Sequence, residues 1–570
     1  MEKHNAYIAK LVSKMTFDQK VGALMTLGLS GTFVRPHIHE YIQKYHCGGL
    51  RLTPESRTFG SYVDPRSGKM VINVEDTKGY KKGINPPTVT ASEYKEILAD
   101  LQAMAMARPL GIPLHFSFDQ EGGSNANFSF SGVNIFPKPM GLRATGDSRF
   151  AYEVALAIAR QSRATGFNWV HSPVLDINVN PENPGICTRS YSDRLEDVIE
   201  YAEQSCRGFQ AGGLIATGKH FPGRGEDAID PHYGVLTIDA DMEKMKTWKL
   251  APYKHLIEKN LLPAIMVAHG VYPRIDPDTV SSVSKKIITG LARDYLEFDG
   301  VITTDSMTMG AISTRYEVNE ACAMALQAGA DLVLMKAENY LVDATFNSIK
   351  RYVEEGKISE QELDDKVYRV LKSKYDCGLF HYGSLWDENP DEVIRDPRIV
   401  NLSKLVAQKS VVVARDKKHT LPLPRNGKML IIEQMRTSVN NIHWHPGMFF
   451  KHCLQYNPGA TYLEIGFTPD DADKSNVRAL VKEFDTIVMT NFFYRSEKGN
   501  NELADELAAD TSKKVVIIAN TPYRNSIPTE ADTVVVTFAT SPHNLEITAG
   551  VLFGDIHPEG EWPVEYQGDR

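Results

Sequence analysis

The chain has 570 residues, which is too long for one compact core and predicts two to four domains. Hydrophobic residues make up 42% and charged residues 24% of it, as in ordinary globular proteins, so disorder and a fibrous fold are not expected. The net charge of −9 argues against a nucleic-acid partner, and no apolar run is long enough to predict a membrane helix.

The N-terminal segment and the cysteines indicate the compartment. Residues 1–14 are polar and lack the apolar segment of a secretory signal. Six cysteines are scattered without the spacing of a disulfide framework or a metal site. We therefore expect a cytoplasmic protein with reduced cysteines and no metal. We also expect a monomer or homodimer without a cofactor.

The first two-thirds of the chain alternates short apolar runs with longer helical patterns such as 151–165, which is typical of βαβ units and a parallel sheet. Eight runs are predicted as strands: 21–29, 48–53, 114–120, 168–177, 214–221, 264–272, 300–307 and 331–335. Eight such units predict a (β/α)8 barrel of the TIM type over residues 1–382. The Gly-, Pro-, Asp- and Lys-rich insertion 54–89 is expected to form a loop at its C-terminal face.

A Gly-, Pro- and Asp-rich stretch over 378–398 predicts an interdomain linker, which we place at 383–405. Five more apolar runs follow: 410–415, 429–432, 486–490, 515–519 and 533–539. They alternate with helical stretches such as 501–509 and predict a smaller α/β sandwich domain over 406–570, with an edge strand at 562–566. No glycine-rich phosphate-binding motif follows these strands, so no nucleotide is expected.

Polar residues stand where the barrel strands end, and such residues face a common pocket in a parallel barrel. The charged or titratable residues at these ends are Asp119, Glu121, Asp176, Lys219, His220, His269 and Asp305. Because unpaired buried charges are costly, so many converging groups are hard to explain as packing. They predict a functional pocket at the mouth of the barrel.

Asp305 closes the seventh predicted strand. Its position alone leaves two roles open, a cap on the following helix or a nucleophile that forms a covalent glycosyl-enzyme. The segment Lys-His-Phe-Pro-Gly-Arg-Gly at 219–225 turns sharply, and Lys219 and His220 at its start suit hydrogen bonding to sugar hydroxyls. A structural salt bridge to a barrel carboxylate is the alternative for Lys219.

Further along, Asp230 stands two residues before His232, and such a carboxylate can orient an imidazole for general acid/base catalysis. Arg189, beyond the fourth strand, is expected to face the same pocket. Asp176 either touches substrate or holds Arg189 or Lys219 in place, and both possibilities stay open.

Several segments resemble glycoside hydrolase family 3, and they occur in the order seen there. They are Asp-Gln-Glu-Gly-Gly at 119–123, Ser-Pro-Val-Leu-Asp at 172–176, Arg-Ser-Tyr at 189–191, Lys-His-Phe-Pro-Gly at 219–223 and the strand at 300–305. The resemblance extends through residues 549–555, covers nearly the whole chain, and is strongest to the bacterial β-N-acetylglucosaminidases in their two-domain form.

This resemblance implies Asp305 as the nucleophile and the Asp230–His232 pair as the acid/base dyad, whereas most β-glucosidases of the family use a glutamate from a later domain. The residues implied or expected to bind the sugar are Asp119, Asp176, Arg189, Lys219, His220, Arg224 and His269. The predicted protein is a retaining, exo-acting β-N-acetylhexosaminidase with a carbohydrate substrate. Ser124 and Asn127, where close relatives carry arginine, and Arg224, where they carry histidine, leave the identity of the −1 sugar open.

Other functions remain as alternatives. One is a β-glucosidase or another exo-β-glycosidase of the same family. Another is a phosphorylase or transglycosylase, because a neutral imidazole repels an anionic acceptor less than a carboxylate does. A metal-dependent barrel hydrolase is disfavoured because the first strand contains no histidine. A non-catalytic sugar-binding protein is disfavoured because the nucleophile and the Asp–His pair are both present.

Overall fold

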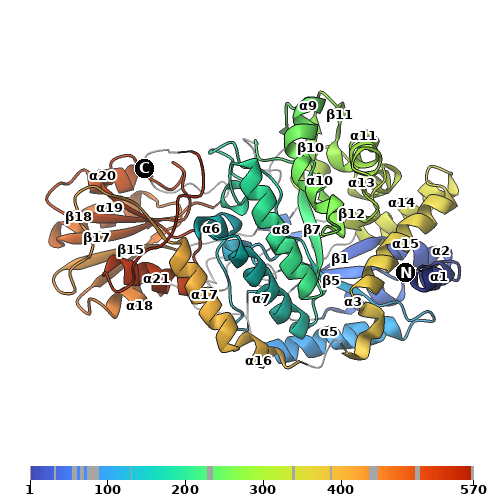
Figure 1. Cartoon of the computed structure of the whole chain (residues 1–570), viewed down its shortest axis with the longest axis horizontal. Coiled ribbons are helices and arrows are strands. Elements are labelled where there is room, and N and C mark those ends of the chain that lie inside the picture. The colour runs from blue at the N-terminus through green and yellow to red at the C-terminus, as the bar shows by residue number, and fades with distance from the viewer. Residues whose placement is uncertain are drawn as a thin grey trace.

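The computed structural model describes residues 2–30, 34–53, 61–63, 70–72, 89–129, 131–226, 235–336, 341–384, 388–435, 447–494 and 501–566. These residues form a large α/β barrel and a smaller α/β domain at its side (Figure 1). None of the described helices is long and apolar enough to cross a membrane.

Eight parallel strands close the barrel in the order β1-β13-β12-β9-β7-β6-β5-β2. Their bounds are β1 (Met25–Ser30), β2 (Gly49–Thr53), β5 (His115–Phe118), β6 (Trp169–Val170), β7 (Ile215–Phe221), β9 (Ala264–Val267), β12 (Val301–Ser306) and β13 (Leu332–Leu334). All eight predicted runs contain a barrel strand, so the (β/α)8 fold is confirmed. The first run was predicted too early, since Thr16 caps the helix α2 (Phe17–Ala23), which occupies its start.

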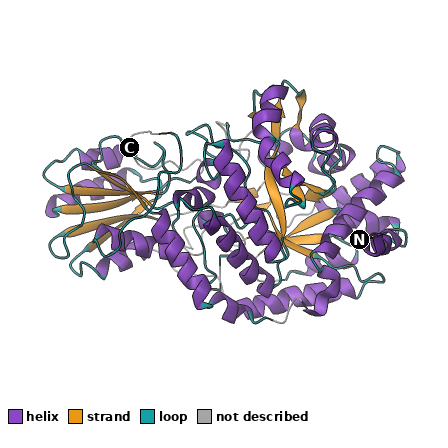
Figure 2. Ribbon diagram, viewed as in Figure 1, coloured by secondary structure: helices purple, strands orange, loops and turns teal. Residues whose placement is uncertain are grey.

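Helices cover the outside of the barrel (Figure 2). They include α1 (Glu2–Val12), α3 (Pro36–Gln43), α5 (Ala91–Met106), α7 (Arg149–Thr165), α8 (Leu195–Ala211), α10 (Ala251–Glu258), α13 (Val318–Gln327), α14 (Leu341–Glu354) and α15 (Glu360–Asp376). Their apolar faces and the strands share one large buried cluster. Some buried polar groups inside the barrel pair with one another, as Trp169 Nε1 does with Thr217 Oγ1 at 2.7 Å and Thr26 Oγ1 does with His115 Nε2 at 2.8 Å. The carboxyl ends of the strands are therefore carried on a well-packed base.

The second domain has a six-stranded sheet in the order β14-β19-β18-β17-β15-β16, in which only β14 runs antiparallel to its neighbour. Its strands are β14 (Val412–Asp416), β15 (Met429–Met435), β16 (Thr461–Gly466), β17 (Thr486–Asn491), β18 (Lys514–Ala519) and β19 (Thr533–Val536). The flanking helices are α18 (Met448–Leu454), α19 (Asp471–Leu480), α20 (Asn501–Ala508) and α21 (Pro542–Leu552), with buried clusters on both faces of the sheet. This is the predicted sandwich, although no strand forms at 562–566.

The predicted linker is not loose chain. It contains α16 (Pro390–Ile394) and the start of α17 (Pro397–Ser410), whose N-caps are Asn389 and Asp396. The Pro, Asn and Asp residues that suggested a linker are instead the residues that begin these two helices. α17 packs against α7 of the barrel and α21 of the second domain, so the connection is part of both bodies.

The insertion 54–89 lies mostly outside the described residues. The described parts of it are the paired short strands β3 (Ser61–Val63) and β4 (Met70–Ile72) and the residue that precedes Thr90. Its predicted place at the C-terminal face of the barrel stays a prediction.

Candidate active site

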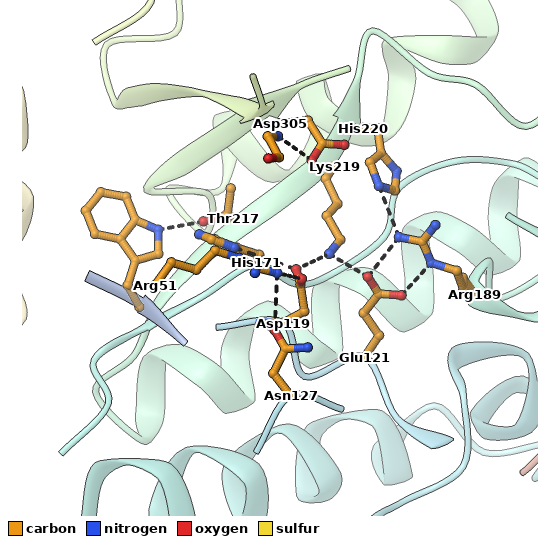
Figure 3. A network of polar contacts seen from close by, with 12 residues as sticks. Arg51, Asp119, Glu121, Asn127, His171, Arg189, Thr217, Lys219, His220 and Asp305 are labelled. Carbon is orange, nitrogen blue, oxygen red and sulfur yellow. Dashed lines mark hydrogen bonds and ion pairs between the residues drawn. The ribbon is translucent and has the colours of Figure 1, made fainter. Parts of the chain in front are cut away.

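A cavity with about 580 Å³ of empty space opens at the carboxyl ends of the barrel strands. Seven of the predicted residues line it: Asp119, Glu121, Arg189, Lys219, His220, Arg224 and Asp305. They come from strands and loops far apart in the sequence, and Figure 3 shows most of them pointing toward one another. The structure thus brings together most of the site that the strand ends predicted.

A buried network of ion pairs forms the floor of this cavity. Lys219, whose side chain is 2% exposed, places Nζ 2.8 Å from Asp119 Oδ1 and 2.5 Å from Glu121 Oε1. Glu121 also accepts two hydrogen bonds from Arg189, 2.7 Å from Nε and 2.9 Å from Nη2. Although burial raises it, the pKa of Glu121 is held at about 2 by Arg189 and Lys219. The carboxylate therefore stays ionised throughout the physiological range.

Arg51, at the third position of β2, lines the cavity and was not predicted as a site residue. Its guanidinium pairs with Asp119 and donates to Asn127 Oδ1 at 3.2 Å, while its buried Nε has no hydrogen-bond partner. Burial raises the pKa of Asp119, but Lys219 and Arg51 outweigh it and hold this pKa well below its usual range. The available signal was a charged residue inside an otherwise apolar run, 48–53.

His171, beyond β6, also lines the cavity and was also missed. Its Nδ1 lies 3.6 Å from Asp119 Oδ1, and burial lowers the pKa of the imidazole. Arg51 on β2 and His171 beyond β6 thus approach Asp119 from the two strands that flank β5 in the barrel. Figure 3 labels all three residues.

Asp176 does not line the cavity, contrary to one of its two expected roles. Its carboxylate accepts from His220 Nδ1 at 2.7 Å and from the backbone N–H of Arg224 at 2.7 Å. The proton of His220 therefore sits on Nδ1, which leaves Nε2 to accept from Arg189 Nη2 at 3.1 Å. Burial lowers the pKa of His220, consistent with a neutral ring. Asp176 orients His220 and the turn that follows, rather than Arg189 or Lys219.

His269 was expected to bind substrate, but it is not among the residues that line the cavity. Its Nε2 lies 2.9 Å from the carbonyl oxygen of Ser306, so this nitrogen is the donor. Its Nδ1 then accepts from Ser282 Oγ at 2.8 Å. Both ring nitrogens are occupied by the protein, and the ring supports the backbone directly after Asp305.

Asp305 is the penultimate residue of β12 and lines the cavity, with Oδ1 accepting from the backbone N–H of Ser306 at 2.7 Å. In the closed order of strands, β12 and β5 stand on opposite sides of the barrel. Asp305 therefore faces the Asp119 and Glu121 side of the network across the cavity. A carboxylate set opposite a cluster of hydrogen-bonding groups suits attack on a sugar whose hydroxyls those groups hold.

Arg224 is buried and lines the cavity, as expected. Its guanidinium lies against Gly185, where an added Cβ would lie 2.4 Å from Nη2, so any larger residue there would displace the guanidinium. The next residue, Gly225, packs against the backbone of Ile177, whose carbonyl oxygen would lie 1.7 Å from an added Cβ. These two glycines let the loops after β6 and β7 lie directly against each other.

Asp230 and His232 lie outside the described residues, so the predicted acid/base dyad stays a prediction. Within the described part of the chain, no group of three or more His, Cys, Asp or Glu side chains is arranged to hold a metal ion.

The family model for the glycosyl hydrolase family 3 N terminal domain matches residues 16–373. The chain belongs to glycosyl hydrolase family 3. Beta-hexosaminidase A of Pseudoalteromonas piscicida is 30% identical over 364 residues, which are 60% of this chain and 56% of that protein. The beta-N-acetylglucosaminidase/beta-glucosidase of Cellulomonas fimi is 28% identical over 353 residues, 60% of this chain and 61% of its own length. The chain thus spans about three-fifths of these two relatives.

Solved structures extend the likeness over both domains. A glycoside hydrolase family 3 beta-N-acetylglucosaminidase from Paenibacillus sp. str. FPU-7 superposes with a TM-score of 0.84 at 27% identity, covering 96% of this chain and 99% of that one. The beta-glucoside phosphorylase BglX, in the structure bound to 2FGlc, has a TM-score of 0.80 at 20% identity, covering 100% of this chain and 97% of that one, and shows the shared fold alone.

Proposed function

We propose that this protein is a retaining, exo-acting β-N-acetylhexosaminidase in which Asp305 is the nucleophile. The observation that carries the proposal is the placement of Asp305 across the cavity from a buried, fully ion-paired network. One wall supplies the reacting carboxylate and the opposite wall supplies fixed donors and acceptors.

The network suits the hydroxyls of one terminal sugar. Each hydroxyl both donates and accepts, and here carboxylate oxygens of Asp119 and Glu121 alternate with the cationic donors of Lys219 and Arg189. Bonds to ionised partners are the strong ones, and their pairing to each other keeps them in place before substrate arrives. Arg51 adds the guanidinium that Ser124 and Asn127 do not provide.

The proposed reaction has two steps. Asp305 attacks the anomeric carbon while His232, held by Asp230, protonates the departing oxygen, and a glycosyl ester on Asp305 results. His232 then removes a proton from water, the water attacks the same carbon, and the ester bond to Asp305 breaks. Each step inverts the configuration at the anomeric carbon, so the two steps together retain it. The roles of His232 and Asp230 come from the sequence.

Two observations favour an N-acetylated sugar over glucose. The relatives and the solved structure that match this chain include proteins named beta-hexosaminidase and beta-N-acetylglucosaminidase. The sequence also carries the Asp-x-His pair at 230–232 that the resemblance ties to this branch.

A panel of aryl β-glycosides tests the proposal. We expect the highest kcat/KM on the N-acetyl-β-glucosaminide, with the β-anomer of the free sugar appearing first in the NMR spectrum. Asp305→Asn should reduce turnover by at least about 10³-fold, whereas Asp294→Asn, at an exposed position on the neighbouring helical segment, should not. An α-anomer as first product, or an active Asp305→Asn protein, would refute the mechanism.

A further inference from the structure

A second pocket, with about 290 Å³ of empty space that includes open solvent, adjoins the cavity of the candidate active site at the junction of the two domains. Its walls are Asn125, Lys138, residues 184–189, Phe493 and Tyr494. Three of these residues, Asn125, Gly185 and Arg189, also line the first cavity, so the two hollows adjoin. We call this second hollow the interdomain pocket.

The interdomain pocket adjoins one end of the cavity of the candidate active site. Asp305 does not line it, whereas Asn125 follows β5, which lies opposite the strand of Asp305 in the barrel. A sugar with its anomeric carbon at Asp305 therefore turns its far hydroxyls toward the interdomain pocket. Substituents on those hydroxyls would enter it, whereas the leaving group departs from the other end.

The charged side chains among the described residues that line the interdomain pocket are both cationic, Lys138 and Arg189. Lys138, directly before α6 (Pro139–Ala144), is 8% exposed, and its Nζ lies 5.9 Å from the centroid of the Tyr494 ring. Among the described residues, this ammonium makes no hydrogen bond or ion pair, and no carboxylate lines the pocket. The other cation, Arg189, is already paired with Glu121. A buried ammonium without a counter-ion is costly, and burial lowers the pKa of Lys138 accordingly.

We infer that the interdomain pocket binds an anionic substituent of the −1 sugar, a carboxylate or a phosphate on a hydroxyl remote from the anomeric carbon, with Lys138 as its counter-ion. The inference rests on the proposed function and specifies its substrate further. An anion here would complete the pairing of Lys138, and the aromatic walls Phe493 and Tyr494 would keep water from weakening it. The second domain thereby contributes to substrate choice.

Aryl N-acetyl-β-glucosaminides with one common leaving group test this inference. The set comprises the unmodified sugar, its 3-, 4- and 6-phosphates, and its 6-carboxylate, so that the chemistry at the anomeric carbon stays the same. For each, kcat/KM is measured with the wild-type protein, Lys138→Met and Lys138→Arg. Lys417→Met, which removes an exposed lysine of the second domain, is the matched control.

We expect the ratio of kcat/KM for at least one charged sugar to that for the unmodified sugar to fall at least about tenfold in Lys138→Met. Lys138→Arg should retain most of this ratio and Lys417→Met all of it. The preferred member of the set distinguishes phosphate from carboxylate. Equal losses on charged and unmodified sugars, or rejection of every charged sugar by the wild-type protein, would overturn the inference. Failure of the proposed function looks different, since no member of the set would then be hydrolysed.

Discussion

Replacing Glu121 by glutamine tests the ion network most directly, because it removes one charge and almost no volume. Glu121 is the residue that joins Lys219 to Arg189, with three contacts between 2.5 and 2.9 Å. In the Glu121→Gln variant, one amide oxygen can still accept, but the two-pronged bond to Arg189 cannot form. Three cations, Lys219, Arg189 and Arg51, are then left with the single carboxylate of Asp119.

Breaking a buried ion pair by removing one partner costs about 3–5 kcal/mol. The entropy of unfolding is about 2.1 cal/mol/K per residue, so a barrel of about 360 residues loses about 0.75 kcal/mol of stability per kelvin near its midpoint. The barrel transition of Glu121→Gln should therefore shift down by about 4–7 °C. Scanning calorimetry is the suitable assay, because it separates the barrel transition from that of the second domain.

The difference in Tm between wild type and Glu121→Gln should become smaller as the pH falls. The pKa of Glu121 is about 2 in the folded protein and about 4.5 when unfolded, so its stabilising effect is complete above pH 4.5 and is lost as the pH falls toward 2. The loss amounts to about 1.4 kcal/mol per pH unit, or about 2 °C here. The difference in Tm between wild type and Glu121→Gln should be constant near neutrality and about 2 °C smaller at pH 3.5.

Glu203→Gln is the matched control. Glu203, on α8, is held at a pKa of about 2 against the effect of burial by His255, Lys259 and Arg207, and it does not line the cavity. Both variants should lose the acid-dependent stability, but only Glu121→Gln should lower kcat/KM, by about 10–100-fold, because Arg189 loses its fixed position. A Glu121→Gln protein with wild-type Tm, or a difference that does not narrow in acid, would refute the argument.

Three further substitutions separate the roles assigned above. Arg51→Met should lower kcat/KM by about 10–100-fold through loss of its charge-assisted bond to Asp119. The control Arg207→Met, on the outer face of α8, should not lower it. If the two variants were equally active, Arg51 would have no role in the site. Asp176→Asn should abolish the Nδ1–H tautomer of His220 in ¹⁵N NMR spectra and raise KM, and an unchanged spectrum would contradict the pairing. His232→Ala should slow poor leaving groups far more than activated aryl ones, and uniform slowing would show that another group is the acid.

The barrel could be predicted because its strands are buried on both faces and appear as continuous apolar runs. The strand β16 could not, because it is an edge strand whose exposed and partly buried residues include Thr461 and Glu464. The two helices at 390–410 could not be predicted either. Their proline and acidic N-terminal residues are shared by linkers and by helix starts, and only packing against α7 and α21 distinguishes the two.

The residues that line the cavity could be predicted only where strand ends point inward. Arg51 escaped because nothing in its own strand relates it to Asp119, which is 68 positions away. His269 and Asp176 were placed in the cavity because they follow strands, yet their side chains turn to backbone and side-chain partners behind it. Position along a strand predicts nearness to a site, whereas the direction of a side chain depends on hydrogen-bond partners that become visible only in three dimensions.

Among the described residues, the second domain supplies none of those that line the cavity of the candidate active site, but it holds one of them in place. The hydroxyl of Tyr523 accepts from Asn178 at 3.0 Å, and the same amide side chain accepts from the backbone N–H of Cys187 at 3.1 Å. Cys187 opens the short helical turn η3 (Cys187–Arg189), so this contact holds the backbone that carries Arg189. A little further on, Asp193 accepts from the backbone N–H groups of residues 565 and 566. These loops have little regular structure of their own. The exact position of the Arg189 side chain therefore depends on the second domain, which contacts the loops.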